Sequence, residues 1–203
     1  MSSAAEVRAR VVEAAMELFW AKGYGGTSVA EILAKTDLNA GSLYHVFPGK
    51  QDVLIAVLEA YRDGIRPRLL EPAWQGVEDP IERVFALLEH YRRMIVATDG
   101  AFGCPIGNLA LELSEPDPAV RDLLALNFDN WAAAVTECLA AAGDRLPPEV
   151  DRDELGAFVL TTMEGGVMLS RTNRDVAYFD RAVKVLRHYF DLLIREGARE
   201  GAT

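Results

Sequence analysis

Residues 27–50 restrict the fold of this chain more than any other stretch, because two short helical segments are separated there by a tight turn. Ser28 and Glu31 have the spacing of a capping box, which starts a helix. Residues 34–38 form the turn, and Asn39 is a suitable N-cap for the second helix. A proline–glycine pair then ends that helix. The pattern is typical of a helix-turn-helix, whose second helix enters the major groove of DNA.

The second helix has distinct inner and outer faces. Leu43 and Phe47 are four residues apart, so they lie on one side of a helix and are expected to face inward. Tyr44 and His45 are then expected to face outward. The sequence therefore predicts that a phenol and an imidazole are presented to DNA.

The remaining predicted DNA contacts are small polar side chains, one glycine and one lysine. Helix N-termini carry free N–H groups and a positive dipole, which suit phosphate. Gly41 lacks a side chain where the backbone could approach DNA closely. Lys50 opposes the dipole of the next helix, and a bound phosphate would offset that. Each residue alone could be an ordinary cap or surface group, but the ordered series favours DNA contact. The small polar residues are Thr27, Ser28, Asn39 and Ser42.

The whole chain is predicted to be all-α, with about nine helices and no strands. Pro67 and Pro72 are expected to break the fourth helix, and Asp-Pro pairs at 79–80 and 117–118 are expected to start two later helices. Outside the helix-turn-helix, the expected helices are 5–22, 50–66, one from residue 80, one from 104 to about 115, one from 118 to about 142, 152–171 and 176–196.

Charge divides the 203-residue chain into two parts. The net charge is -10, yet residues 1–50 contain five basic and five acidic residues. The other 16 basic and 26 acidic residues lie in 51–203, so this part carries the whole negative charge. An acidic body repels DNA, and only the N-terminal head could dock. The expected domains are therefore a DNA-binding head, 1–49, and a ligand-binding and dimerisation body, 50–203, connected by the helix at 50–66.

Several protein classes are not favoured. A membrane protein is not expected, because no run of 18 apolar residues occurs. The two cysteines, Cys104 and Cys138, show no metal or disulfide spacing, which together with the absence of a signal peptide predicts a cytoplasmic protein. His45, His90 and His188 are far apart, and no phosphate loop or nucleophile elbow is present. We therefore expect neither a metal, nor a cofactor, nor an enzyme.

The body is predicted to contain a site for a small molecule. Such sites are mostly apolar with a few polar groups, and aromatic and sulfur-containing residues concentrate between residues 85 and 168. Packing in the core alone would account for most of them. The predicted ligand-binding residues are Tyr91, Phe102, Cys104, Asn108, Phe128, Trp131, Met163 and Glu164.

Cys104 allows two interpretations. It directly precedes Pro105, so it is expected at the N-terminus of a helix, where a thiol gains thiolate character and reactivity. The alternative is a buried thiol that acts as a small hydrophobic residue. Cys138 is expected in the core.

The last two helices, 152–171 and 176–196, carry long apolar stripes. Gly165 and Gly166 would allow another helix to approach closely. A four-helix bundle across a two-fold axis would bury the stripes and form a homodimer. The alternative is that the stripes only close the core of one monomer.

Residues 7–62 resemble the N-terminal part of the tetracycline-repressor (TetR) family of bacterial regulators. The matching pieces are Ala14-Ala15-Met16-Glu17-Leu18-Phe19, Lys22-Gly23-Tyr24, Thr27-Ser28-Val29, Ala30-Glu31-Ile32, Gly41-Ser42-Leu43-Tyr44-His45 and Phe47-Pro48-Gly49-Lys50. The resemblance implies an all-α homodimer with a DNA-binding head and a ligand-binding body. It also implies DNA contacts from the eight residues named above, which are Thr27, Ser28, Asn39, Gly41, Ser42, Tyr44, His45 and Lys50. The family commonly has histidine at the position of Val46, so His45 is expected to replace that contact.

A second stretch, residues 103–112, reads Gly-Cys-Pro-Ile-Gly-Asn-Leu-Ala-Leu-Glu and resembles the body motif of a TetR subgroup. Some members of that subgroup respond to electrophiles, in part through this cysteine. The resemblance therefore implies a sensing role for Cys104.

Together these features predict a ligand-responsive transcriptional regulator, most simply a repressor that binds a palindromic, double-stranded DNA operator as a dimer. A small apolar or electrophilic effector in the body would tilt the helix at 50–66 and release the DNA. The alternative function is a helical small-molecule-binding protein without a role on DNA.

Overall fold

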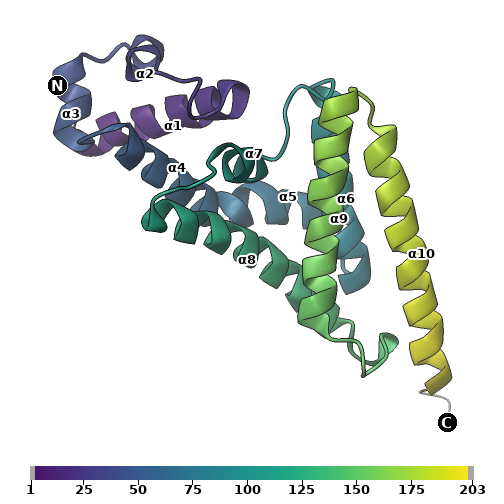
Figure 1. Ribbon diagram of the computed structural model, residues 1–203. Coiled ribbons are helices and arrows are strands. Elements are labelled where there is room, and N and C mark those ends of the chain that lie inside the picture. The colour runs from purple at the N-terminus through teal and green to yellow at the C-terminus, as the bar shows by residue number, and fades with distance from the viewer. Residues whose placement is uncertain (1–2, 201–203) are drawn as a thin grey trace. The chain divides into compact units, whose positions relative to one another are not determined.

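The computed structural model describes residues 3–200, and every regular element in this range is helical (Figure 1). The predicted all-α class is confirmed. The α-helices are α1 (Ala4–Lys22), α2 (Val29–Thr36), α3 (Ala40–Val46), α4 (Lys50–Ile65), α5 (Glu71–Trp74), α6 (Pro80–Ala97), α7 (Pro105–Glu112), α8 (Pro118–Ala141), α9 (Arg152–Asn173) and α10 (Ala177–Glu200). A π-helical segment, Arg66–Leu70, precedes α5, and a 3-10 turn, Gly143–Arg145, follows α8.

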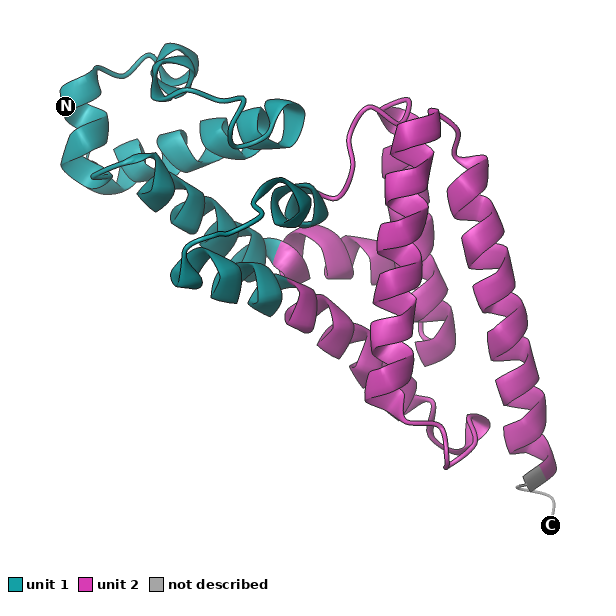
Figure 2. Ribbon diagram, viewed as in Figure 1, with its two compact units in different colours: residues 1–64, 105–127 teal, residues 65–104, 128–203 magenta. Residues whose placement is uncertain are grey.

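The chain forms two compact units (Figure 2). The first contains residues up to 64 and residues 105–127, so α7 and the start of α8 belong with the four N-terminal helices. The second contains 65–104 and 128 onwards. The functional division proposed from the sequence, at residue 50, stays a prediction.

The first unit is built on the apolar stripe of α1. Ser3 and Glu6 form a capping box that starts this helix. The helix ends at Gly23, whose φ of 80° lies in a region that favours glycine. The Phe19 ring packs edge-on against Tyr24, with 5.4 Å between the centroids. The buried apolar side chains of the four N-terminal helices include Val11, Ala15, Phe19, Ile32, Leu43, Phe47, Val53, Leu54, Val57 and Leu58.

The predicted end of the fourth α-helix before Pro67 is confirmed, but the two prolines do not end the helical path of the backbone. Helix α4 ends at Ile65, but the backbone stays helical through Trp74 by way of the π-helical segment. Proline lacks an N–H donor, so it disturbs regular α-helical bonding. Here the bonding changes at Pro67 to the wider π pattern, and Pro72 lies in the first turn of α5, where no N–H is needed.

The second unit is organised by the pair α9 and α10, which lie side by side (Figure 1). Arg174 ends α9 in a left-handed conformation, with φ at 53°, and reverses the chain. A Cβ atom built on Gly166 would be 2.9 Å from the Phe179 ring, so this glycine permits the close approach predicted from the sequence. Gly165 has no such neighbour within 4 Å. Phe85 and Phe190 stack edge-to-face in the core, 5.2 Å apart.

Candidate nucleic-acid interface and interior cluster

Helix α2 begins at the predicted capping box. The Ser28 hydroxyl accepts a hydrogen bond from the Glu31 N–H at 3.2 Å, and Glu31 Oε2 accepts one from the Ser28 N–H at 2.8 Å. A hydrogen bond from Lys22 and those from Ser28 lower the pKa of Glu31 to about 2. The start of α2 is therefore fixed by its own sequence, and Ser28 remains exposed.

Asn39 is the N-cap of helix α3, as predicted. Asn39 Oδ1 accepts from the Ser42 N–H at 2.8 Å. A Cβ atom on Gly41 would lie 3.2 Å from that same oxygen. Glycine at this position thus leaves room for the cap, which is a local reason for Gly41 beside the predicted approach of DNA. The turn before α3 passes through Asp37, whose φ is 51°; Asp is one of the residues that tolerate this conformation.

The two faces of α3 are as predicted. Leu43 and Phe47 are buried, at 0% and 1% exposure. Tyr44 is 52% exposed, and His45 is also exposed. The buried pair anchors the helix, and the phenol and imidazole remain available on its outer side.

The prediction that Thr27 contacts DNA is wrong. Its side chain is only 1% exposed, and its hydroxyl donates to the Gly23 carbonyl at 2.8 Å. The hydroxyl therefore closes the turn between α1 and α2 and is not available to a phosphate. The sequence pattern could not separate it from Ser28, which lies beside it and is exposed.

All five basic side chains among residues 3–50 have partners within the protein. Three pair with carboxylates: Lys22 with Glu31, Lys35 with Glu17, and Arg8 with Glu59. Arg10 donates to the carbonyl of Thr36. Lys50 Nζ lies 4.2 Å from the centroid of the Tyr24 ring. Partial burial lowers the pKa of Lys50, and the negative charges of Glu112 and Glu31 oppose this.

Tyr91 and Trp131 form the centre of the predicted ligand site in the second unit. Their rings are 6.3 Å apart and edge-on, and Trp131 Nε1 donates to the Tyr91 hydroxyl at 3.1 Å. Both are buried, as is Met163. Burial is the main cause that raises the pKa of Tyr91, followed by the charges of Cys104 and Glu164. Four predicted residues are thus brought close together: Tyr91, Trp131, Cys104 and Glu164.

Glu164 is an incompletely satisfied carboxyl group in this cluster. Among the described residues none donates to its buried Oε1. Burial raises its pKa above the ordinary 4.5, and a hydrogen bond with Cys104 partly opposes this. The fold therefore favours the protonated acid, and its contribution to stability falls as the pH rises above about 4.5. An unsatisfied buried oxygen in a native structure calls for a partner such as water, an ion or a ligand.

The other predicted ligand residues are placed less closely. Phe102 and Phe128 are half-buried in the same unit as Tyr91. Asn108 belongs to the other unit, on α7. Cys138 is 5% exposed, which confirms its predicted place in the core.

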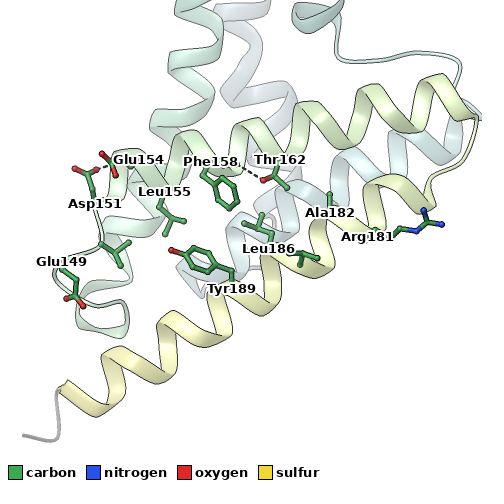
Figure 3. Close-up of a pocket in the computed structure, with 12 residues that line it drawn as sticks. Glu149, Asp151, Glu154, Leu155, Phe158, Thr162, Arg181, Ala182, Leu186 and Tyr189 are labelled. Carbon is green, nitrogen blue, oxygen red and sulfur yellow. Dashed lines mark hydrogen bonds between the residues drawn. The ribbon is translucent and has the colours of Figure 1, made fainter.

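The outer sides of α9 and α10 expose an unusual number of large apolar side chains. Three of them, Phe158, Val185 and Tyr189, line a groove of about 960 Å³ between the two helices (Figure 3). Val185 is 70% and Phe158 50% exposed, and the Phe158 ring packs edge-on against Tyr189. We call this surface the outer apolar face; it comprises Phe158, Met168, Leu169, Val185, Tyr189 and Leu192.

No group of three or more histidine, cysteine, aspartate or glutamate side chains among residues 3–200 is placed to hold a metal ion. Within the same range, no helix has the length and apolar character needed to cross a membrane.

Two family models match the chain. Residues 11–57 match the model described as "Bacterial regulatory proteins, tetR family", and residues 80–185 match "Transcriptional regulator LmrA/YxaF-like, C-terminal domain". The chain is 28% identical to the HTH-type transcriptional regulator YxaF of Bacillus subtilis, over 86% of this chain and 90% of that one. It is 25% identical to the HTH-type transcriptional repressor DhaR of a Mycobacterium species, over 89% and 90% of the two chains.

Solved structures agree with these sequence matches. A TetR transcriptional regulator from Chloroflexus aurantiacus superimposes with a TM-score of 0.81 at 30% identity, over 94% of this chain and 97% of that one. The match extends over both compact units.

Proposed function

The chain belongs to the tetR family of bacterial transcriptional regulators, and from this membership we propose that it is a dimeric repressor which a small effector releases from a palindromic operator. As a regulator of this family it is not an enzyme. The observation that carries the proposal is the outer face of α3, where Tyr44 and His45 are exposed on a helix anchored by Leu43 and Phe47. The alternative, a small-molecule carrier without a role on DNA, finds no support among the relatives, which are named as regulators.

The proposed DNA contacts come from three short segments of the head. Helix N-termini hold backbone donors for phosphates, and α3 holds the groups for base edges. Thr27 is not included, because its hydroxyl is used inside the head. The proposed contact residues are Ser28, Asn39, Gly41, Ser42, Tyr44, His45 and Lys50.

A binding experiment with the DNA that flanks the gene for this protein tests the proposal. We expect Tyr44→Ala to weaken binding about tenfold or more, because loss of a base-reading contact costs about 1–3 kcal/mol. Tyr178→Ala, which removes a half-buried tyrosine from α10 in the second unit, is the matched control and should leave binding unchanged. The measurement is fluorescence anisotropy at low salt. If the unaltered protein binds no segment of this flanking DNA, it has no operator beside its own gene and the proposal fails.

The homodimer is proposed to form through α9 and α10. An apolar surface of this kind on a soluble protein marks an interaction site, and a two-fold pairing would bury it against its own copy. The outer apolar face lies on the two helices predicted for this purpose.

The effector is proposed to bind at the cluster of Tyr91, Trp131, Cys104 and Glu164. The free oxygen of Glu164 would accept a hydrogen bond from an otherwise apolar molecule. Phe102, Phe128 and Met163, which belong to the same unit as this cluster, would add apolar surface. The motif around Cys104 adds a second proposal, that electrophiles act through its thiol.

Thiol modification tests the role of Cys104. N-ethylmaleimide forms a C–S bond with a thiolate, and the thiol proton passes to the maleimide carbon. We expect this reagent to weaken DNA binding about tenfold, a usual size for allosteric coupling. Cys104→Ser should abolish the effect.

The second cysteine supplies the control. Cys138 is buried, and burial raises the pKa of its thiol, so Cys138→Ser should respond to the reagent like the unaltered protein. Mass spectrometry would show which thiol has reacted. Release of DNA from the Cys104→Ser variant would rule out Cys104 as the sensor.

A further inference from the structure

A carboxylate from α7 binds the backbone of the loop that joins α1 to α2. Glu112 Oε2 accepts a hydrogen bond from the Tyr24 N–H at 2.8 Å, and Oε1 accepts one from the Gly25 N–H at 2.6 Å. One side chain therefore satisfies two consecutive donors just beyond the end of α1. Hydrogen bonds from N–H groups to a carboxylate are short and strong compared with neutral ones.

The glycines of this loop leave the space that the carboxylate occupies. A Cβ atom on Gly23 would lie 2.7 Å from Glu112 Oε2, and one on Gly25 would lie 3.0 Å from Oε1. Successive N–H groups that converge on one anion form a backbone nest. The loop is thus fitted to an anion, and within this unit Glu112 supplies it.

The same loop holds Lys50, a proposed phosphate contact. The Tyr24 backbone binds Glu112, while the Tyr24 ring lies under the Lys50 ammonium at 4.2 Å. The charge of Glu112 also acts on Lys50 directly and favours its protonated form. The positions of Tyr24 and of the Lys50 ammonium therefore depend on the position of the Glu112 carboxylate.

We propose that Glu112 is a positioning residue for DNA binding: its carboxylate holds the α1–α2 loop, and with it Lys50, in the arrangement that the head uses on DNA. This inference rests on the proposed DNA-binding role of the head. Glu112 does not contact DNA itself, because its negative charge would repel phosphate. It acts through Tyr24 and Gly25.

We call the two hydrogen bonds from the Tyr24 and Gly25 amides to Glu112 the clamp. The position of Glu112 at the end of α7 connects this clamp to the body. Helix α7 begins directly after Cys104 and ends at Glu112, so its eight residues span roughly 12 Å. A displacement at the start of so short a helix moves its end as well. The body then has a route to the head through α7 and Glu112, in addition to α4.

Removal of the carboxylate tests the inference. We expect Glu112→Ala to weaken binding to the flanking DNA about tenfold, a usual size for coupling between sites. Glu112→Gln should give a smaller loss, because its amide oxygen can still accept one hydrogen bond. Glu115→Ala, which removes an exposed carboxylate three residues further on, should change binding less than about twofold.

Hydrogen exchange supplies a readout specific to the clamp. In Glu112→Ala the Tyr24 and Gly25 amides should exchange faster, while the buried amides of α1 keep their protection. Gly25→Ala attacks the clamp from the other side, because its Cβ would press on Oε1. It should weaken DNA binding in the unaltered protein and have little further effect in Glu112→Ala, as expected for two changes to one interaction.

Three outcomes decide the matter. In the first, Glu112→Ala binds DNA as tightly as the unaltered protein although its Tyr24 and Gly25 amides exchange fast. The clamp would then be only a local structural contact, which would overturn this inference but not the proposed function. Tighter binding by Glu112→Ala would also overturn it, because Glu112 would then compete with DNA. Absence of DNA binding by the unaltered protein would overturn the proposed function, and the DNA role of Glu112 with it.

Discussion

Phe158→Glu should convert the proposed dimer into monomers and weaken DNA binding by about a hundredfold or more, because the linkage of two heads is lost. Phe158 is half exposed at the groove between α9 and α10, beside Tyr189 (Figure 3). In a two-fold interface the introduced carboxylate would be buried without a partner, on both copies, which costs several kcal/mol. A single head would then have to bind one half-site alone, which would forfeit the second set of contacts.

Sedimentation velocity measures the oligomeric state in this experiment, and anisotropy measures the DNA affinity. Val96→Glu is the matched control, because Val96 is an apolar residue of similar exposure, 54%, that lies on α6 and outside the outer apolar face. It should remain dimeric. A Phe158→Glu protein that stays dimeric would move the interface away from α9 and α10.

Phe47→Ala should destabilise the head and abolish DNA binding. The Phe47 ring is 1% exposed and lies under the guanidinium of Arg8, with 4.8 Å to the ring centroid. Truncation of a buried phenylalanine to alanine costs about 3–5 kcal/mol, because it removes apolar contacts and leaves a cavity. Since a whole domain is stable by only about 5–15 kcal/mol, α3 would lose its fixed position.

Thermal unfolding followed by circular dichroism measures this effect, together with hydrogen exchange in α3. Val46→Ala is the neighbouring control: Val46 is only half-buried, so its truncation should cost much less. If Phe47→Ala kept the stability and DNA affinity of the unaltered protein, α3 would not depend on this anchor.

The sequence predicts those parts of the fold that depend on local interactions. The caps at Ser28, Asn39 and Asp79 satisfy N–H groups within three residues, and the structure places a helix start at each. Spacing along one helix was also sufficient to distinguish the inner and outer faces of α3. Pro67 correctly predicts the end of α4, but it does not reveal that the chain changes its hydrogen-bonding pattern there without leaving a helical path.

Contacts between distant segments were not predictable in this way. Glu112 is 88 positions from Tyr24, and nothing in the spacing of either segment reveals that they meet. The glycines around Tyr24 indicated the end of a helix, but not that they leave room for a carboxylate. Thr27 was misassigned for the same reason, since only the closed turn shows that its hydroxyl is already used.

The internal pairing of the head's cations has a consequence for how such a protein would find its operator in a cell. Sequence-independent attraction to DNA comes mainly from lysine and arginine that release counterions from phosphates. In this head those side chains already have carboxylates, a carbonyl or an aromatic ring as partners. Non-specific binding to the rest of the chromosome would therefore hold back only a small share of the protein molecules in a cell. Occupancy of the operator would then depend on the match to its bases more than on the number of molecules present.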